Sequence, residues 1–326
     1  MAELTLLDAV NQALAHALAA DENVVLLGED IGVNGGVFRA TDGLQDRFGV
    51  DRVIDTPLAE SLIAGMSIGM AAQGLRPVAE IQFMGFIYPA MDQILNHASR
   101  LRTRTRGRLS CPLVMRAPFG GGIHAPEHHS ESTESMFAHI PGLRVVIPSS
   151  PARAYGLLLA SIRDPDPVIF LEPKRVYRML KQEVTDNGEA LPLDVCFTVR
   201  QGGDITVVSW GAMMHEVMLA AEQMEGEGVD CEIIDVASIK PLDMETILES
   251  VGRTGRCVIV HEAARTAGFG AEIAANLAER GLMSLFAPVA RVTGYDTVMP
   301  LHQLEQVYMP SPETICAAIR KTMAYA

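Results

Sequence analysis

The chain has 326 residues, of which 48% are hydrophobic and 20% charged, so it has enough apolar material for two globular domains. Its formal net charge of −14 argues against nucleic acid as a partner, because phosphate would be repelled, but it suits docking onto a basic protein surface. The cysteines are scattered without a CxxC pair, which indicates buried reduced thiols rather than a zinc knuckle or a disulfide framework.

The start of the chain predicts no targeting segment. Met1-Ala2-Glu3-Leu4-Thr5 contains no basic region followed by an apolar one, so we expect neither a signal peptide nor a transit peptide. No apolar run is long enough to cross a bilayer, so no membrane partner is expected. Cytoplasmic residence is the resulting expectation.

The first helix is predicted to begin after Thr5, with Asp8 completing a capping box. Its apolar side chains recur at helical spacing, at Leu6, Val10, Ala13, Leu14, Ala17 and Leu18. Short apolar runs then predict strands at Val24–Leu27, Arg52–Ile54, Pro77–Ile81, Leu113–Arg116, Leu143–Ile147 and Val168–Leu171. Helical patterns lie between most of them, including Tyr88–Arg102 and Pro151–Ile162.

This alternation of strands and helices predicts an α/β fold with a parallel sheet that is covered on both faces. Open sheets of this kind bind ligands at the carboxyl ends of their strands. Glu29, Glu60 and the loop after Ile81 all fall at that edge.

A second α/β domain is predicted after a linker. Turn signals at Asp186-Asn187-Gly188 and Leu191-Pro192-Leu193 mark residues 186–203 as the linker, between a first domain at 1–185 and a second at 204–326. The second domain has predicted strands at Ile205–Ser209, Cys231–Val236, Arg256–His261 and Ala290–Val292. Its predicted helices are Met213–Glu225, Met244–Val251, Gly270–Arg280 and Pro312–Met323.

The stretch from Asp55 to Met66 is the most informative part of the chain. A strand runs into a turn in which Thr56 can cap a helix and Pro57 suits the first helical position, and Glu60 then stands in the first turn. The helix that follows is almost entirely small or apolar, so we expect it to be buried. Glu60 has either a structural role, complementing the helix dipole, or a chemical one.

A glycine-rich loop leads into three histidines, His124, His128 and His129. Glycines at 120–122 allow the backbone to approach a ligand closely. The histidines could ligate zinc, although no flanking cysteine or HExxH pattern supports a metal. A neutral imidazole can instead donate and accept a proton near pH 7. No motif assigns a role to His124 or His128, for which surface polarity is the alternative.

Several blocks in order resemble one family, the beta subunit of the thiamine-diphosphate-dependent decarboxylase of 2-oxo acid dehydrogenase complexes. Beside Asp55–Met66, the blocks are Leu27-Gly28-Glu29-Asp30-Ile31-Gly32, Gly35-Gly36-Val37-Phe38, Glu80-Ile81-Gln82-Phe83, His128-His129-Ser130-Glu131-Ser132 and Phe170-Leu171-Glu172-Pro173-Lys174. The resemblance covers essentially the whole chain. It implies a transketolase-like pyrimidine-binding domain followed by a transketolase carboxyl-terminal domain.

The resemblance also implies site residues. Glu60 matches the glutamate that hydrogen-bonds to the aminopyrimidine of thiamine diphosphate and favours its imino tautomer, while the cofactor supplies the reactivity. Leu58 and Gln82 would line the pyrimidine pocket and Phe86 would stack on the ring, whereas core packing is preferred for Phe83. His129 would act near the substrate and the incoming lipoyl group.

An absent motif points to partners. Enzymes of this class hold the diphosphate and its magnesium with Gly-Asp-Gly, which occurs nowhere in this sequence. The resemblance therefore implies an alpha subunit that holds that end of the cofactor, in a heterotetramer with a second beta subunit. It also implies that the carboxyl-terminal domain docks on a lipoyl acyltransferase core.

Three further patterns remain. By resemblance, a structural potassium ion would lie near the carbonyls of Leu113, Ser161 and Ile162, with Asp164 and Asp166, although Pro165 and Asp166 differ from the family's commoner residues. Alternating arginines from Arg100 to Arg108 are either a solvated helix end or an alpha-subunit contact. The segment at 268–273 half-matches a dinucleotide fingerprint, but Gly270 more simply opens a helix.

The sequence thus predicts the beta subunit of an enzyme that decarboxylates a 2-oxo acid and reductively acylates a lipoyl group. Pyruvate is favoured over branched-chain substrates, because Asn34–Thr41 and the glycine-rich loop look more like bacterial pyruvate enzymes. Acetoin cleavage by a related complex is an alternative. A cofactor-free structural dimer of the same fold is the alternative outside enzymes, and Glu60, Gln82, Phe86 and His129 speak against it.

Overall fold

The computed structural model describes residues 2–325, which fall into two units. The first unit contains the chain up to Phe119 together with Met136–Leu193. The second contains Gly120–Ser135 together with the chain from Asp194 onward. The glycine-rich loop therefore packs with the carboxyl-terminal half of the chain, although in sequence it interrupts the amino-terminal half.

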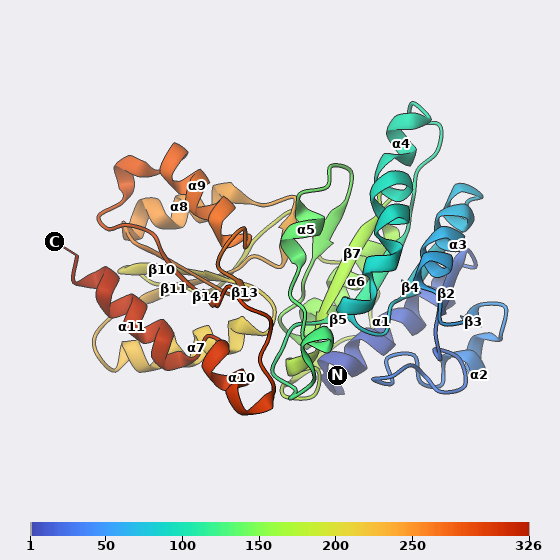
Figure 1. Cartoon of the computed structure of the whole chain (residues 1–326), viewed down its shortest axis with the longest axis horizontal. Helices are drawn as coiled ribbons and strands as arrows, with labels where there is room; N and C mark the ends of the chain where they lie inside the picture. The colour runs from blue at the N-terminus through green and yellow to red at the C-terminus, as the bar shows by residue number, and fades with distance from the viewer. Residues whose placement is uncertain (1, 326) are drawn as a thin grey trace. The chain divides into compact units, whose positions relative to one another are not determined.

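The first unit is built on the predicted parallel sheet (Figure 1). Its strands follow the spatial order β6-β7-β5-β4-β2-β3, and all their pairings are parallel. The bounds are β2 (Val24–Gly28), β3 (Val53–Asp55), β4 (Arg76–Glu80), β5 (Val114–Phe119), β6 (Arg144–Val146) and β7 (Val168–Pro173). The apolar runs placed each of these strands within a few residues.

The helices of this unit are α1 (Leu6–Ala20), α2 (Leu44–Phe48), α3 (Glu60–Ala72), α4 (Leu101–Arg104) and α6 (Pro151–Arg163), with α5 (Glu134–Ala138) crossing the boundary between the units. The capping box of Thr5 and Asp8 is confirmed, and the predicted apolar face of α1 is buried. Helix α1 packs along α6. The sequence did not reveal the small antiparallel pair of β1 (Ala2–Thr5) and β8 (Lys181–Val184).

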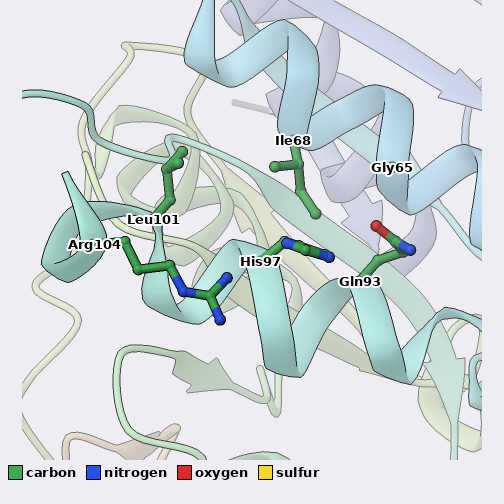
Figure 2. A pocket seen from close by; sticks show the side chains of 6 residues that line it. All are labelled: Gly65, Ile68, Gln93, His97, Leu101 and Arg104. Carbon is green, nitrogen blue, oxygen red and sulfur yellow. The ribbon is translucent and has the colours of Figure 1, made fainter.

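The predicted helical segment Tyr88–Arg102 is helical, but it is not a regular α-helix. It contains 3₁₀ turns at Tyr88–Ala90 and Ala98–Arg100 and a π-helical turn at Gln93–His97, and a further 3₁₀ turn at Met84–Phe86 precedes it. A groove of about 240 Å³ lies between this segment and α3, and Figure 2 shows its lining side chains. They are Gly65 and Ile68 on α3, Gln93 and His97 on the π turn, and Leu101 and Arg104 on α4.

Helix α3 also differs from the prediction. It begins at Glu60 with Ala59 as its N-cap, so Thr56 does not cap it and Pro57 lies before it. Only four of its side chains are buried, at Ile63, Ala64, Ser67 and Ala71. Leu62 is 43% exposed, so the apolar composition of α3 leaves one face uncovered by this chain.

The second unit has a sheet in the order β14-β13-β10-β11-β9. Its strands are β9 (Phe197–Arg200), β10 (Ile205–Ser209), β11 (Cys231–Asp235), β13 (Cys257–Ala264) and β14 (Ala290–Gly294), and β12 (Ser238–Lys240) lies outside this sheet. Only β9, which the sequence did not reveal, is antiparallel. In Figure 1, α7 (Met213–Glu225) and α11 (Pro312–Met323) cover one face, and α8 (Met244–Thr254) and α9 (Gly270–Arg280) cover the other.

Two general expectations can be compared with this fold. All five cysteines are buried and free, as their spacing predicted. Among residues 2–325, no helix combines the length and the apolar character needed to span a membrane.

Candidate active site

Three strands of the first unit bring the predicted cofactor residues to one edge. Gly28 at the end of β2 pairs with Asp55 on one side and Glu80 on the other. The backbone N–H of Thr56 then donates to the carbonyl of Gly28 at 2.9 Å, so the turn that precedes α3 starts directly above β2. Glu29, Glu60 and Gln82 consequently leave the sheet at the same edge.

Glu60 and Glu29 lie close enough to interact at this edge. Burial raises the pKa of Glu29, and the neighbouring carboxylates of Asp30 and Glu60 raise it further. Glu60 is half-buried at the first position of α3. The arrangement places a carboxylate in a partly dry position, where it can accept a hydrogen bond from a ligand.

The side chains of the other predicted pocket residues differ in how exposed they are. Leu58 is 71% exposed, whereas Gln82 and Phe86 are half-buried. The ring of Phe86 meets Phe83 edge-on, with centroids 5.7 Å apart, and Phe83 meets Phe38 in the same way at 5.4 Å. The packing interpretation of Phe83 agrees with its place at the middle of this aromatic row.

A buried charged cluster below this edge was missed by the sequence analysis. Arg116 on β5 donates from Nε to Glu172 at 2.6 Å and from Nη1 to Glu80 at 2.8 Å. The hydroxyl of Tyr177 donates to the other oxygen of Glu172 at 2.6 Å. The guanidinium is thus held between carboxylates on both neighbouring strands. The available signal was a buried charged residue in each of three strands that are otherwise mostly apolar.

The glycine-rich loop is held by two glutamates of the second unit. Gly120 has a φ of +87°, and a side chain there would collide with the carboxylate of Glu262. Ser132 donates its hydroxyl to Glu262 at 2.9 Å. Glu305 accepts the backbone N–H groups of Gly122 at 2.7 Å and His124 at 3.1 Å. These carboxylates follow the loop by more than 120 residues, so local patterns could not indicate them.

The three histidines of this loop have different surroundings. His124 has a φ of +59° and places Nδ1 2.9 Å from a carboxylate oxygen of Glu305, while its side chain is 60% exposed. His129 closes a short 3₁₀ turn at Glu127–His129, and its ring lies edge-on to that of His128, with centroids 6.5 Å apart. Within residues 2–325, no group of three or more His, Cys, Asp or Glu side chains could hold a metal ion.

Comparisons with known proteins identify the family of this chain. Residues 2–179 match the family described as the transketolase pyrimidine-binding domain, and residues 196–315 match the transketolase C-terminal domain. The chain is 51% identical to the pyruvate dehydrogenase E1 component subunit beta of Acholeplasma laidlawii, over 98% of each chain. It is 46% identical to the protein of the same description from Bacillus subtilis (strain 168), over 100% of each. The chain belongs to the pyruvate dehydrogenase E1 beta-subunit family.

A solved structure supports the fold of the family independently. A chain described as a split gene transketolase, inactive beta4 tetramer, superimposes with a TM-score of 0.82 and covers 99% of each chain. Its sequence identity of 22% is low, so this likeness concerns the fold alone. The predicted transketolase-like pair of α/β domains is confirmed.

A second buried cluster lies in the carboxyl-terminal unit of this family member. Burial raises the pKa of Glu134 to about 7, and the carboxylate of Glu262 adds to the rise. The indole of Trp210 stacks on the imidazole of His261, with ring centroids 5.3 Å apart. Burial lowers the pKa of His261 to about 4, so this imidazole is neutral at pH 7. No sequence motif pointed to this cluster.

The corner after α6 contains the residues expected to bind potassium, and arginines already bind several of their oxygens. Ile162 accepts a hydrogen bond from Arg76 at 3.0 Å through its carbonyl. Asp164 pairs with Arg144 at 2.9 Å, and Asp166 pairs with Arg102 at 2.6 Å. The carbonyls of Leu113 and Ser161 accept hydrogen bonds from the backbone N–H groups of Val168 and Asp164.

Proposed function

We propose that this chain is the beta subunit of a thiamine-diphosphate-dependent pyruvate dehydrogenase that acetylates a lipoyl group. The observation that carries the proposal is the place of Glu60, at the first position of α3 and beside Glu29, at the ligand-binding edge of a parallel sheet. Membership of the E1 beta-subunit family supplies the reaction class. The retained site residues favour an enzyme over a structural dimer of the same fold.

The residues of the first unit fit an aminopyrimidine ring. A carboxylate in a partly dry position can accept the ring N–H, and the half-buried ring of Phe86 offers a face for stacking. Gln82 would hydrogen-bond at the ring edge, and Leu58 would cover it. When bound, thiamine diphosphate supplies the nucleophilic carbon and accepts the electrons released by decarboxylation. Glu60 would hold a proton on a nitrogen of the aminopyrimidine ring.

His129 would act on the acyl-transfer half of the reaction. Transfer of an acetyl group to a lipoyl thiol needs a group that can give and take a proton near pH 7, and a histidine side chain can do both. The 3₁₀ turn at Glu127–His129 holds its backbone, because His129 N–H donates to the carbonyl of Pro126 at 2.9 Å. The proposed reaction therefore uses a cofactor-activating carboxylate of the first unit and a proton-transferring imidazole of the second.

The open side of the Glu60 edge supports a shared active site. Val33, Val37 and Leu58 are 87%, 44% and 71% exposed, and exposed apolar groups beside a ligand edge favour a covering partner. We propose that an alpha subunit covers them and holds the diphosphate and magnesium, since Gly-Asp-Gly is missing here. Two alpha and two beta subunits would form the heterotetramer. The carboxyl-terminal domain would dock on the lipoyl acyltransferase core, in the cytoplasm.

A potassium ion at the corner after α6 is a subordinate part of the proposal. The carbonyls of Leu113 and Ser161 would provide its oxygen ligands most directly, because arginines already bind Ile162, Asp164 and Asp166. Such an ion would stabilise the turn that joins α6 to β7. It has no step in the reaction.

Reconstitution tests the proposed function. The isolated chain is expected to bind thiamine diphosphate poorly and to decarboxylate no 2-oxo acid, while addition of an alpha subunit is expected to restore both. Pyruvate, branched-chain 2-oxo acids and acetoin are then compared as substrates, with pyruvate expected to have the highest kcat/KM. Substantial decarboxylation by the isolated chain would contradict the shared active site.

A further inference from the structure

We propose that Glu305 is a positioning residue that fixes the glycine-rich loop and, through it, His129. The inference rests on the proposed function of His129. Glu305 lies on α10 (His302–Tyr308), and its side chain is 3% exposed. One carboxylate oxygen accepts the N–H of Gly122 at 2.7 Å, and the other accepts the N–H of His124 at 3.1 Å. The imidazole of His124 also approaches the second oxygen, at 2.9 Å.

These contacts explain the unusual backbone of the loop. Gly122 and His124 both have positive φ values, +85° and +59°, which turn their N–H groups toward the same side. Neighbouring N–H groups of this kind form a concave site for an anion, and Glu305 supplies that anion from within the chain. Hydrogen bonds from N–H groups to a carboxylate are stronger than neutral ones. A histidine at positive φ is strained, so Glu305 maintains a conformation that the loop alone would not favour.

The path from Glu305 to His129 is short and well held. His129 follows His124 by five positions, and Ser130, which follows His129, donates its hydroxyl to the carbonyl of Pro126 at 3.1 Å. On the far side, the N–H of Gly120 donates to the carbonyl of Glu131 at 2.8 Å. Ser132 is held by Glu262. The loop is thus closed at its base, and Glu305 fixes the part that would otherwise move.

Three variants of the assembled enzyme, with alpha subunit and lipoyl domain, test this role. Glu305→Ala removes both acceptors, and Glu305→Gln retains one carbonyl oxygen. Glu232→Gln is the matched control, because Glu232 is also buried in the second unit, pairs with Arg253 and accepts a backbone N–H, from Gly202. Hydrogen exchange of peptides covering residues 120–126 is measured by mass spectrometry. We expect faster exchange in Glu305→Ala, an intermediate rate in Glu305→Gln and the wild-type rate in the control.

Kinetics then separate positioning from general damage. Glu305→Ala is expected to lower kcat for lipoyl acetylation by about tenfold or more, because a misplaced catalytic group loses near-attack geometry. The decrease in kcat caused by Glu305→Ala should not add to the decrease caused by His129→Ala, because both substitutions act through the same imidazole. Additive losses in the double variant, or unchanged exchange in Glu305→Ala, overturn the proposal. Full lipoyl acetylation by His129→Ala alone would instead contradict the proposed function, while the exchange result would still decide whether Glu305 holds the loop.

Discussion

Replacement of Glu134 by glutamine tests the buried cluster around Trp210. Glu134 is 1% exposed, and burial raises the pKa of its carboxyl from 4.5 to about 7. The folded chain therefore holds this proton more tightly than the unfolded chain does. The resulting stabilisation is complete below about pH 4.5 and is lost as the pH rises toward 7. The difference between the two pKa values of Glu134 corresponds to about 3 kcal/mol of unfolding free energy, at about 1.4 kcal/mol per pH unit.

Glu134→Gln keeps the size of the side chain and removes its ionisation. We therefore expect the free energy of unfolding of the variant, minus that of the wild type, to increase by about 3 kcal/mol between pH 4.5 and pH 8. The assay is urea unfolding of the full-length chain at a fixed protein concentration. Trp210 is the only tryptophan of the sequence, so its fluorescence reports on the second unit.

The neutral His261 beside Trp210 has the opposite pH dependence. Burial lowers its pKa to about 4, so the stability that it contributes is present above about pH 6.5 and is lost as the pH falls. The contribution of His261 is the same in the wild type and in Glu134→Gln, so it cancels when their free energies of unfolding are subtracted. Glu249→Gln, at an exposed position of α8, is the control and should show no pH-dependent difference. A constant difference for Glu134→Gln from pH 4.5 to pH 8 would refute the reasoning.

Four further outcomes are expected. Glu60→Gln should lower turnover of the assembled enzyme by about a hundredfold or more with little change in Tm, whereas near-normal activity with a lower Tm would mark a helix-dipole residue. His129→Ala should depress lipoyl acetylation, and loss of stoichiometric zinc in this variant would favour the metal interpretation. Docking of the carboxyl-terminal domain on the acyltransferase should weaken with salt, because the net charge is −14; salt-insensitive binding by residues 1–185 would contradict this. Potassium should raise Tm relative to choline, and an equal Tm with the two cations would contradict a potassium site in the turn after α6.

Local patterns in the sequence determined much of the framework. The apolar runs located six parallel strands of the first unit, because strands buried on both faces are mostly apolar. The Thr5 capping box and the bounds of α7, α9 and α11 were also predicted, since helix signals depend on residues only a few positions apart. The family, and with it the fold, followed from motifs whose order is visible in the chain alone.

Other features depend on contacts between distant residues. Helix α3 begins three residues later than its capping signal suggested, and the turn before it is bound to the sheet, where the N–H of Thr56 donates to the carbonyl of Gly28. The segment Tyr88–Arg102 is interrupted by a π turn that no periodicity reveals. Arg116 was unremarkable until the sheet placed Glu80 and Glu172 on either side of it.

The glycine-rich loop shows most clearly what the sequence indicates by itself and what only the tertiary structure reveals. Its sequence indicated a close backbone approach and a proton-transferring histidine, because glycine and imidazole have those properties wherever they occur. Only the tertiary structure showed that the loop packs with the second unit and is held by Glu262 and Glu305. Glu305 follows Gly122 by 183 residues. No local preference encodes such a pairing, since it is fixed by the folding of the whole second unit around the loop.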